Sequence, residues 1–193
     1  MSDVLLFLPG LIIGVTFHEF SHGLAARALG DRYAQSQGRL TLNPLAHLSL
    51  IGFAAFFVLR FGWARPVPIN PYNFKKPRRD LLLVALAGPF SNLLLAAVVL
   101  PLLPLLQGTW LTVAVAFIYI NSILAAVNLL PVPPLDGSRI WLSFVPRMQL
   151  RLPRWVSYVW IVILILAIRS GVLTGFLNAI IRLANQVVVA VLY

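Results

Sequence analysis

The sequence predicts an all-α polytopic membrane protein with about five to six helical segments, including one short re-entrant or half-buried helix, and a small membrane-associated β-hairpin. Hydrophobic residues make up 60% of the 193 residues and charged residues only 10%, whereas soluble domains are closer to half apolar and a quarter charged. Apolar runs that are long enough to cross a bilayer recur along the chain. We therefore expect one membrane-embedded domain over residues 1–193, with a core at 4–146 and C-terminal helices at 155–193.

The charge and the absence of cysteine narrow the chemistry. The net charge is +10, but basic residues in short loops between apolar runs are what orients a membrane protein, so nucleic acid is not an expected partner. Because the chain has no cysteine, it can form neither a disulfide nor a thiolate ligand, and any metal must bind to nitrogen and oxygen. The chain opens with Met1-Ser2-Asp3 rather than with a basic segment, so no secretory signal peptide is expected.

The first span is predicted from Val4 to Leu29, and Gly10 and Gly14 within it are spaced for close packing against another helix. In the polar stretch that follows, Gly38–Leu42 alternates in polarity and ends at an Asn-Pro turn, which predicts a short strand. The apolar run Leu48–Leu59 is too short for an ordinary span. It predicts the re-entrant or half-buried helix.

The second span is predicted over Leu81–Leu106, with Asp80 as its N-cap and a kink at Gly88-Pro89. Before it, the prolines of Pro66–Pro71 favour an extended segment. We expect this segment to pair with the edge of the first strand and so to complete the hairpin.

The third span is predicted over Trp110–Leu130. It ends in the proline-rich stretch Pro131–Gly137, which cannot be regular helix, and a helix is expected to resume near Ser138. Two further apolar segments follow, Trp155–Ile168 and Val172–Tyr193. The sequence leaves open whether the last one spans the membrane or lies in its interface.

Loop charge predicts the orientation. The loops at 60–80 and 137–154 are rich in arginine and lysine, whereas the loop at 107–109 has neither. The positive-inside rule places the two basic loops in the cytoplasm and the third outside, so the first helix ends on the cytoplasmic side.

One motif stands out among the few ionisable residues. His18-Glu19-Phe20-Ser21-His22 is an H-E-x-x-H sequence inside the first span. Residues four apart on a helix share one face, so His18 and His22 can bind one zinc ion while Glu19 lies beside the water on that ion. Ionisable groups within a membrane span are costly and mark functional sites. By contrast, Asp3, Asp31 and Asp80 are interpreted as helix-capping and loop residues.

A catalytic zinc ion needs a third protein ligand. Asp136, in the proline-rich break, is favoured over His47, which follows a turn near the membrane surface. At about 1.5 Å per residue, both His18 and the break after Leu130 lie within about 10 Å of the cytoplasmic edge of the hydrocarbon layer. Asp136 can therefore reach the two histidines.

Three segments together resemble the site-2 protease family of intramembrane zinc metalloproteases. They are HEFSH in the first span, GPFSN at Gly88–Asn92 and NLLPVPPLDG at Asn128–Gly137. Gly38–Pro44 and Pro66–Asn73 are similar to the small sheet of compact bacterial members that have no PDZ or CBS domain. The resemblance implies one Zn²⁺ per chain bound by His18, His22 and Asp136, with Glu19 as the catalytic acid/base and Asn128 lining the substrate path.

A protease of this type hydrolyses a peptide bond within or near a transmembrane segment, so the expected partners are a membrane protein with a single transmembrane helix and the lipid bilayer. The expected location is the bacterial plasma membrane, with the active site near the cytoplasmic face. An unwound substrate can be held by an edge strand. The expected substrate-binding residues are Asn128, Asn92, His47, Gly38, Arg39, Leu40, Thr41 and Leu42. For Asn128, Asn92 and Asn121, hydrogen bonding between helices is the equal alternative, and His47 could instead donate to an oxyanion or orient a ligand.

Two other functions are compatible with histidine and aspartate in a membrane. A metal transporter needs ligands at several depths, whereas the donors here cluster at one level. A non-catalytic zinc-binding scaffold normally closes its site with four protein ligands, and three are found here.

Overall fold

The computed structural model describes residues 2–50, 52, 54–55, 64–144 and 154–193. Four of its helical segments are long and apolar enough to cross a membrane: Leu5–Ala28, Pro77–Leu105, Gly108–Asn128 and Thr174–Leu192. The protein is therefore an integral membrane protein, as predicted. In chain order, the helices are α1 (Ser2–Ala28), α2 (Tyr33–Ser36), α3 (Pro44–His47), η1 (Pro71–Asn73), α5 (Pro77–Val99), η2 (Leu100–Leu105), α6 (Gly108–Asn128), α7 (Asp136–Phe144), α8 (Arg154–Arg169) and α9 (Thr174–Leu192).

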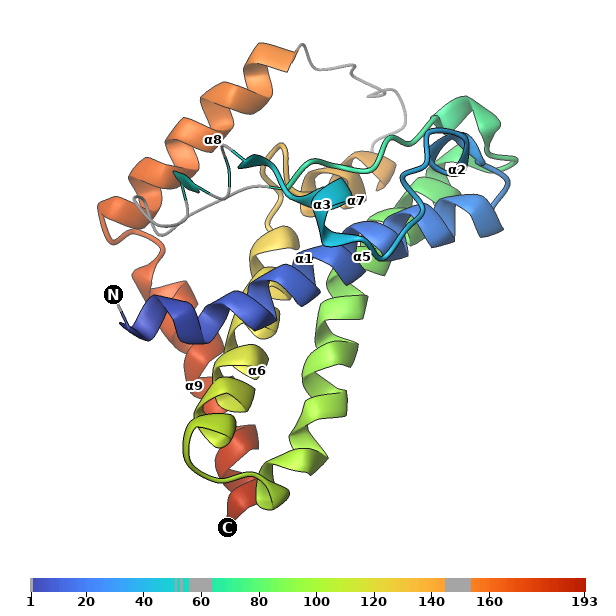
Figure 1. Cartoon of the computed structure of the whole chain (residues 1–193). Coiled ribbons are helices and arrows are strands. Elements are labelled where there is room, and N and C mark those ends of the chain that lie inside the picture. Colours follow the sequence, from blue (N-terminus) through green and yellow to red (C-terminus); the bar gives the residue numbers. More distant parts are fainter. Residues whose placement is uncertain (1, 51, 53, 56–63, 145–153) are drawn as a thin grey trace.

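Helix α1 lies obliquely across α5 and α6 and packs against both (Figure 1). Glycine makes the approach possible, because a Cβ atom on Gly10 would overlap Ile120 and Phe117, and one on Gly14 would overlap Asn121. Small residues allow helix backbones to approach closely in membranes. The predicted packing role of the two glycines is confirmed.

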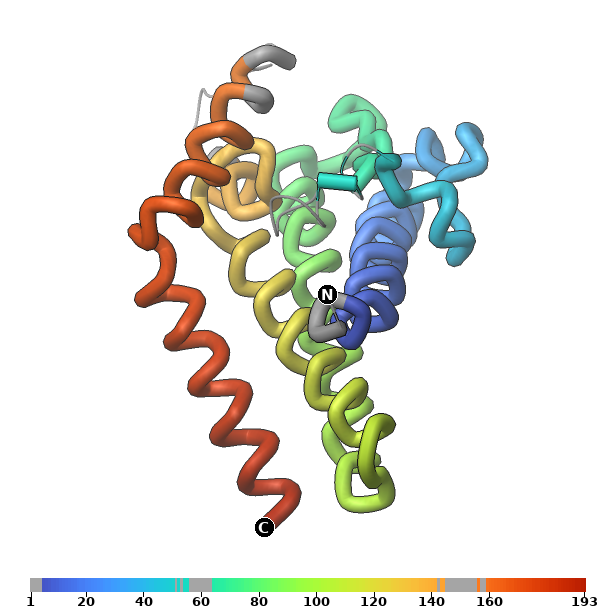
Figure 2. Tube along the Cα trace, turned by 60° about the vertical axis from the view of Figure 1, so that its left-hand side comes forward, coloured from blue at the N-terminus to red at the C-terminus, as the bar shows by residue number. Residues whose placement is uncertain are grey.

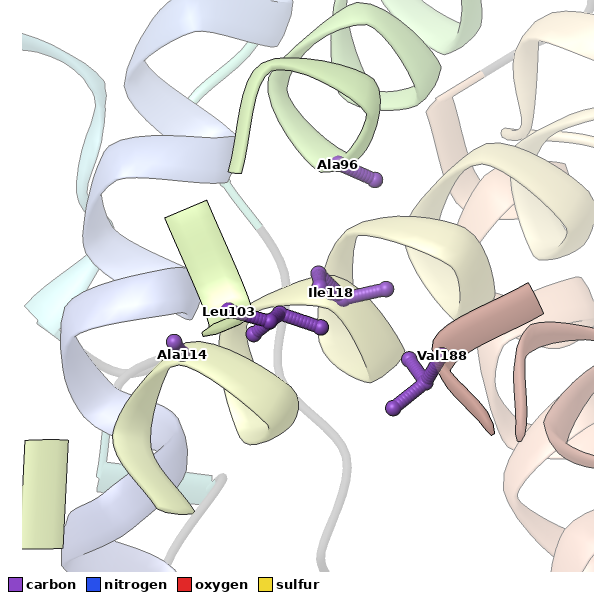
Figure 3. Close-up of a cluster of buried hydrophobic side chains, with 5 residues drawn as sticks. All are labelled: Ala96, Leu103, Ala114, Ile118 and Val188. Atoms are coloured by element: carbon purple, nitrogen blue, oxygen red, sulfur yellow. The ribbon is translucent and has the colours of Figure 1, made fainter. Parts of the chain in front are cut away.

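Helix α9 packs along α6 and against η2 (Figure 2). A cluster of buried apolar side chains joins these three elements to α5, and Figure 3 shows its five members, Ala96, Leu103, Ala114, Ile118 and Val188. This cluster lies at the end of the bundle where α5 continues into η2. The length and composition of α9 are those of a membrane span.

The second span begins earlier than predicted. Helix α5 starts at Pro77, because proline has no N–H to leave unpaired in a first turn and its φ angle suits a helix. Asp80 lies inside this first turn, where its Oδ2 accepts a hydrogen bond of 3.0 Å from the amide of Lys76. The assignment of Asp80 as the residue before the helix was therefore wrong, although its carboxylate does cap the helix start.

The predicted β-hairpin is absent from the described residues, which contain only an isolated antiparallel bridge between Leu48 and Ala64. The reason is that side chains occupy the backbone groups that a hairpin needs. The amide of Val67 donates to Glu19 and that of Asn70 donates to Asp31, while prolines at 66 and 68 have no amide to donate.

The proline-rich break after α6 is confirmed, but helix α7 resumes at Asp136 rather than near Ser138. Gly137 allows the chain to turn back on the end of α6, because a Cβ atom there would overlap the carbonyl oxygens of Leu129 and Leu130. Half of the short helix predicted for 48–59 lies outside the described residues.

Candidate metal centre

Three side chains from two distant parts of the chain meet between α1 and α7. The Nε2 atom of His18 lies 2.9 Å from Oδ2 of Asp136, and Nε2 of His22 lies 3.0 Å from the same oxygen. The two Nε2 atoms are 3.1 Å apart. All three residues are buried. Among the described residues, His18, His22 and Asp136 form a group that can hold a metal ion, and His47 is not a member.

The hydrogen-bond partner of Nδ1 in each imidazole decides which ring nitrogen carries the proton. Nδ1 of His18 lies 2.7 Å from Oδ1 of Asn92, and Nδ1 of His22 lies 2.7 Å from the carbonyl oxygen of Val84. Both partners are hydrogen-bond acceptors, so Nδ1 carries the proton in each neutral ring and Nε2 is left with a lone pair. The carboxylate of Asp136 adds a third acceptor at the same point. Three converging acceptors require a cation between them.

The chemistry and spacing of this group fit zinc. Ligand atoms of a tetrahedral zinc ion lie about 3.3 Å apart, given zinc–ligand distances of about 2.0–2.1 Å. The observed separations of 2.9–3.1 Å are close to that value. Two imidazoles and one carboxylate make three protein ligands, which leaves the fourth position open as in catalytic sites.

Helix α5 supports the two imidazole rings. Gly88 faces them so closely that a Cβ atom at this position would overlap both His18 and His22. One turn further, the fully buried Asn92 holds His18, and its Nδ2 donates to the carbonyl of Gly14 at 3.1 Å and to Oδ1 of Asn121 at 2.9 Å. These two bonds leave Oδ1 of Asn92 as the atom that accepts from His18. Partners of this kind fix the orientation of a metal ligand.

The aspartate of the group is held in its charged form. Burial by itself raises the pKa of the Asp136 carboxyl. The charge of His22 and the hydrogen bonds from both imidazoles, which form only when no metal ion occupies their Nε2 atoms, outweigh burial and hold this pKa well below its ordinary value. A carboxylate that stays ionised at this position is available to a cation.

Glu19 points toward the extended segment that precedes α5. Its side chain is buried, and Oε2 accepts a hydrogen bond of 2.8 Å from the amide of Val67. The nearby Arg39 donates from Nη2 to the carbonyl oxygens of Arg65 at 2.7 Å and Pro66 at 3.4 Å. Burial lowers the pKa of Arg39 from its ordinary value and Arg65 lowers it further, while the charge of Glu19 raises it.

The remaining candidate residues lie elsewhere. His47 is fully buried, with Nε2 at 2.7 Å from the carbonyl oxygen of Thr41, and Nδ1 has no hydrogen-bond partner in the part of the chain that the structure describes. Asn128 donates 2.9 Å to the carbonyl of Leu124 in its own helix. Asn121 bonds to backbone oxygens of α1 and α6 through its Nδ2, which is the helix-to-helix alternative expected for it.

The segment Gly38–Leu42 runs beside the site without forming a strand. Gly38 has a positive φ of 65°, Leu42 is 49% exposed, and Thr41 Oγ1 accepts from the amide of Asn43 at 3.1 Å. The side chain of Leu40 approaches Gly23 of α1.

Sequence reasoning missed the amide of Val67 and the role of Asn92 as a partner of His18. Only the second had a signal in the sequence, an amide in an apolar helix one turn after Gly88.

A groove of about 340 Å³ lies on the surface of α5 but does not mark this site. Helical spacing places most of its lining on the face of α5 away from Gly88 and Asn92. The lining is entirely apolar: Leu83, Leu86, Ala87, Pro89, Phe90, Leu93 and Leu129.

A helical membrane protein with a buried His-His-Asp group and an adjacent glutamate belongs to the class of membrane metalloproteins. Peptidase family M50 matches residues 6–113 and 104–170 of the chain. This chain therefore belongs to the M50 family, the site-2 proteases, and is a zinc metalloprotease.

Relatives in bacteria and archaea bear names that agree with this assignment. "Putative zinc metalloprotease YwhC" of Bacillus subtilis (strain 168) is 42% identical over 184 residues, which cover 88% of this chain and 84% of that protein. A relative named in the same way, Rip2 of Mycolicibacterium smegmatis, is 30% identical over 144 residues, and the match covers 69% of this chain and 54% of Rip2. MJ0611 of Methanocaldococcus jannaschii is 29% identical over 150 residues, which cover 74% of this chain and 75% of MJ0611. No solved structure matches the chain significantly.

Proposed function

We propose that this zinc metalloprotease is an intramembrane endopeptidase that hydrolyses a peptide bond within or near a transmembrane segment of a membrane protein substrate. His18, His22 and Asp136 hold one zinc ion, and Glu19 is the catalytic acid/base. The observation that carries the proposal is the convergence of three buried acceptor atoms within 3.1 Å of one another, inside a bundle of membrane-spanning helices. A charged site of this kind is costly in a membrane unless it binds a cation.

When bound, zinc supplies a Lewis acid that polarises the scissile carbonyl and lowers the pKa of water from about 15.7 toward about 7. Glu19 takes the proton from the attacking water and returns it to the leaving amine, so one carboxylate acts as base and then as acid. Glu19 is the single glutamate in the chain. Asn92 keeps His18 in the tautomer whose Nε2 faces the site.

A substrate helix must be unwound before it is cut, because its scissile carbonyl is otherwise held in the helix hydrogen-bond ladder. The segment Gly38–Leu42 is the proposed clamp. Within the described residues, the amides of Leu40 and Leu42 make no hydrogen bond, so main-chain pairing with an extended substrate is open to them. His47 is proposed to hold this segment through the carbonyl of Thr41. Asn128 is the proposed contact to the substrate at the end of α6.

The depth of the site supports a transmembrane substrate and a cytoplasmic orientation. Gly88, which touches both imidazoles, lies about 10 Å along α5 from Leu81, where the apolar part of the helix begins. Lys75, Lys76 and Arg79 are exposed just before that point. The positive-inside rule places this end at the cytoplasmic face of a bacterial plasma membrane. The substrate we propose is a membrane protein with a single transmembrane helix.

The test uses the full-length protein in liposomes together with candidate single-span substrates. Zinc is measured by atomic spectrometry, and cleavage is compared between the wild type and Glu19→Gln. We expect the variant to keep its zinc and to cleave about 10²- to 10⁴-fold more slowly, the usual contribution of a general acid/base. Cleavage at the wild-type rate by Glu19→Gln would refute the mechanism. Zinc flux across the liposomes, or bound zinc without any cleavage, would instead favour a transporter or a scaffold.

A further inference from the structure

The contact between Glu19 and Val67 has an unusual setting in the chain. Val67 stands between Pro66 and Pro68, and proline has no amide hydrogen. The N–H of Val67 is therefore the one amide donor of this tripeptide, and it donates 2.8 Å to Oε2 of Glu19. The side chain of Val67 is also buried, at 3% exposure, and its position is close to Gly23, one turn after Glu19 in α1.

A second interaction fixes the segment from its other side. Nη2 of Arg39 donates to the carbonyl oxygens of Arg65 and Pro66, the two that immediately precede the Val67 amide. Arginine presents several N–H donors in a rigid plane, so one guanidinium can hold two neighbouring carbonyls. The proline rings restrict the φ angles on both sides of Val67. The Val67 amide thus comes from a segment with little freedom to move.

We propose that the Val67 amide, aligned by its flanking prolines and by Arg39, is a positioning group for the catalytic carboxylate. It binds Oε2 of Glu19 and leaves Oε1 as the oxygen that carries the proton. Within the described residues Oε1 has no hydrogen bond, whereas Oε2 has the bond to Val67. The inference rests on the proposed role of Glu19, and it assigns Arg39 to the enzyme's own loop rather than to substrate binding.

The physical reason is the geometry that proton transfer demands. A general base must lie within hydrogen-bond reach of the proton that it removes, and catalytic side chains are effective when neighbouring groups lock their orientation. A glutamate side chain has three rotatable bonds and loses this geometry easily. One bond from a rigid backbone amide to one carboxylate oxygen removes most of that freedom and keeps the second oxygen available.

The first experiment removes only the N–H group. The amide of Val67 is replaced by an ester through cell-free incorporation of the α-hydroxy analogue of valine, and Val67→Ala serves as the control that keeps the N–H. Because the chain has one glutamate, ¹³C-carboxyl glutamate gives a single infrared carboxylate band, which reports Glu19 with or without zinc. We expect the ester to shift this band and to lower kcat about 10- to 100-fold, with KM and zinc content unchanged. Val67→Ala should leave the band in place.

An unshifted band in the ester protein, or a kcat within twofold of the wild type, would overturn the inference. Loss of zinc from the ester protein would also overturn it, since the contact would then be structural. The failure of the proposed function looks different. In that case Glu19→Gln cleaves at the wild-type rate, whatever the infrared band of Glu19 does in the ester protein.

The second experiment concerns Arg39 and needs only ordinary variants. Arg39→Gln removes the charge and most of the donors, whereas Arg39→Lys keeps one charged donor group. We expect kcat to fall about 10-fold in Arg39→Gln and to be partly restored in Arg39→Lys, with KM unchanged in both variants. The infrared band of Glu19 should shift more in Arg39→Gln than in Arg39→Lys. A rise in KM with kcat unchanged would instead place Arg39 in substrate binding and contradict its positioning role.

Discussion

The part of the molecule up to α7 and the two C-terminal helices differ in what they bury. Among the described residues, every buried polar or charged side chain lies between Thr16 and Asp136. Among the described side chains of helices α8 and α9, those that are buried are apolar, namely Leu164, Ala184 and Val188. The family match includes α8 and ends at residue 170, before α9 begins.

The difference shows which kind of interaction specifies each region. Buried polar groups in a membrane must find particular partners at particular distances, so the first region tolerates little change. Apolar helix faces can exchange a neighbouring helix for lipid at small cost, because lipid is equally apolar. We therefore expect substitutions around the metal group of the first region to affect zinc binding and cleavage, and comparable substitutions in the second region to affect neither.

The largest effect is expected when a metal ligand is removed. Asp136→Asn takes away the charged ligand shared by the two histidines at 2.9 and 3.0 Å, and zinc binding depends on a deprotonated ligand. Zinc content should fall to near zero and cleavage should disappear with it. Metal analysis of the purified protein measures this.

The matched control is Asp80→Asn, which alters another buried aspartate in the first turn of a helix. Asp80 caps the amide of Lys76 and is not part of the metal group. Its loss should lower stability by about 1 kcal/mol and leave the zinc content unchanged. Equal loss of zinc in both variants would show that the effect is general unfolding.

The next effect comes from a single methyl group. In Gly88→Ala the new Cβ atom overlaps the rings of both His18 and His22, so the ligands must move or α5 must shift. We expect zinc affinity and the cleavage rate each to fall about 10- to 100-fold, as when a group that orients a metal ligand is lost. Zinc titration against a competing chelator gives the affinity.

The same substitution in the other region should be harmless. A Cβ atom on Gly175 of α9 would have no heavy atom within 4 Å. Alanine favours a helix over glycine by about 1 kcal/mol, so Gly175→Ala should keep its zinc, its activity and at least its stability. If Gly175→Ala lost zinc as Gly88→Ala does, the contrast between the two regions would be wrong.

Much of the site could be predicted because it depends on local or one-dimensional rules. The shared face of His18 and His22 follows from helix periodicity alone. Asp136 could be placed with them because the bilayer fixes a depth scale along each span, and in the structure its Oδ2 lies within 3.0 Å of both rings. The preference for Asp136 over His47 as the third member of the group agrees with the structure.

The error over the hairpin arose because a sequence does not show which atoms meet across long separations. The hairpin was predicted from alternation and prolines, but Glu19 takes the amide of Val67, 48 positions away. Asn92 makes the helix-to-helix hydrogen bonds that were one of its two expected roles, but the sequence did not show that its partner across 74 positions would be His18. Such pairings depend on how helices cross, and nothing in local propensity encodes them.

A smaller effect is expected at the support of His18. Asn92→Ala removes the acceptor at 2.7 Å from Nδ1 and the two bonds that Asn92 donates to α1 and α6. Zinc affinity should fall about 10-fold, the lower end of the range for groups that orient a metal ligand. The control is Asn185→Ala, since Asn185 also links two helices, through Tyr119 at 2.8 Å, but at an exposed position. Its zinc affinity should equal that of the wild type.

The smallest effect is expected from apolar packing alone. Val84 and Val188 are both buried valines on spanning helices, at 1% and 3% exposure. The Val84 side chain packs with Ala26 and Phe74, and its carbonyl holds His22, whereas Val188 packs between α9 and its apolar neighbours. Val188→Ala should cost less than about 1 kcal/mol, because lipid can replace the lost contacts, and cleavage should stay within twofold of the wild type. Val84→Ala should cost about 1–2 kcal/mol and weaken zinc binding measurably. Thermal unfolding and chelator titration of the two variants compare them, and a larger loss in Val188→Ala would mean that α9 supports the metal centre after all.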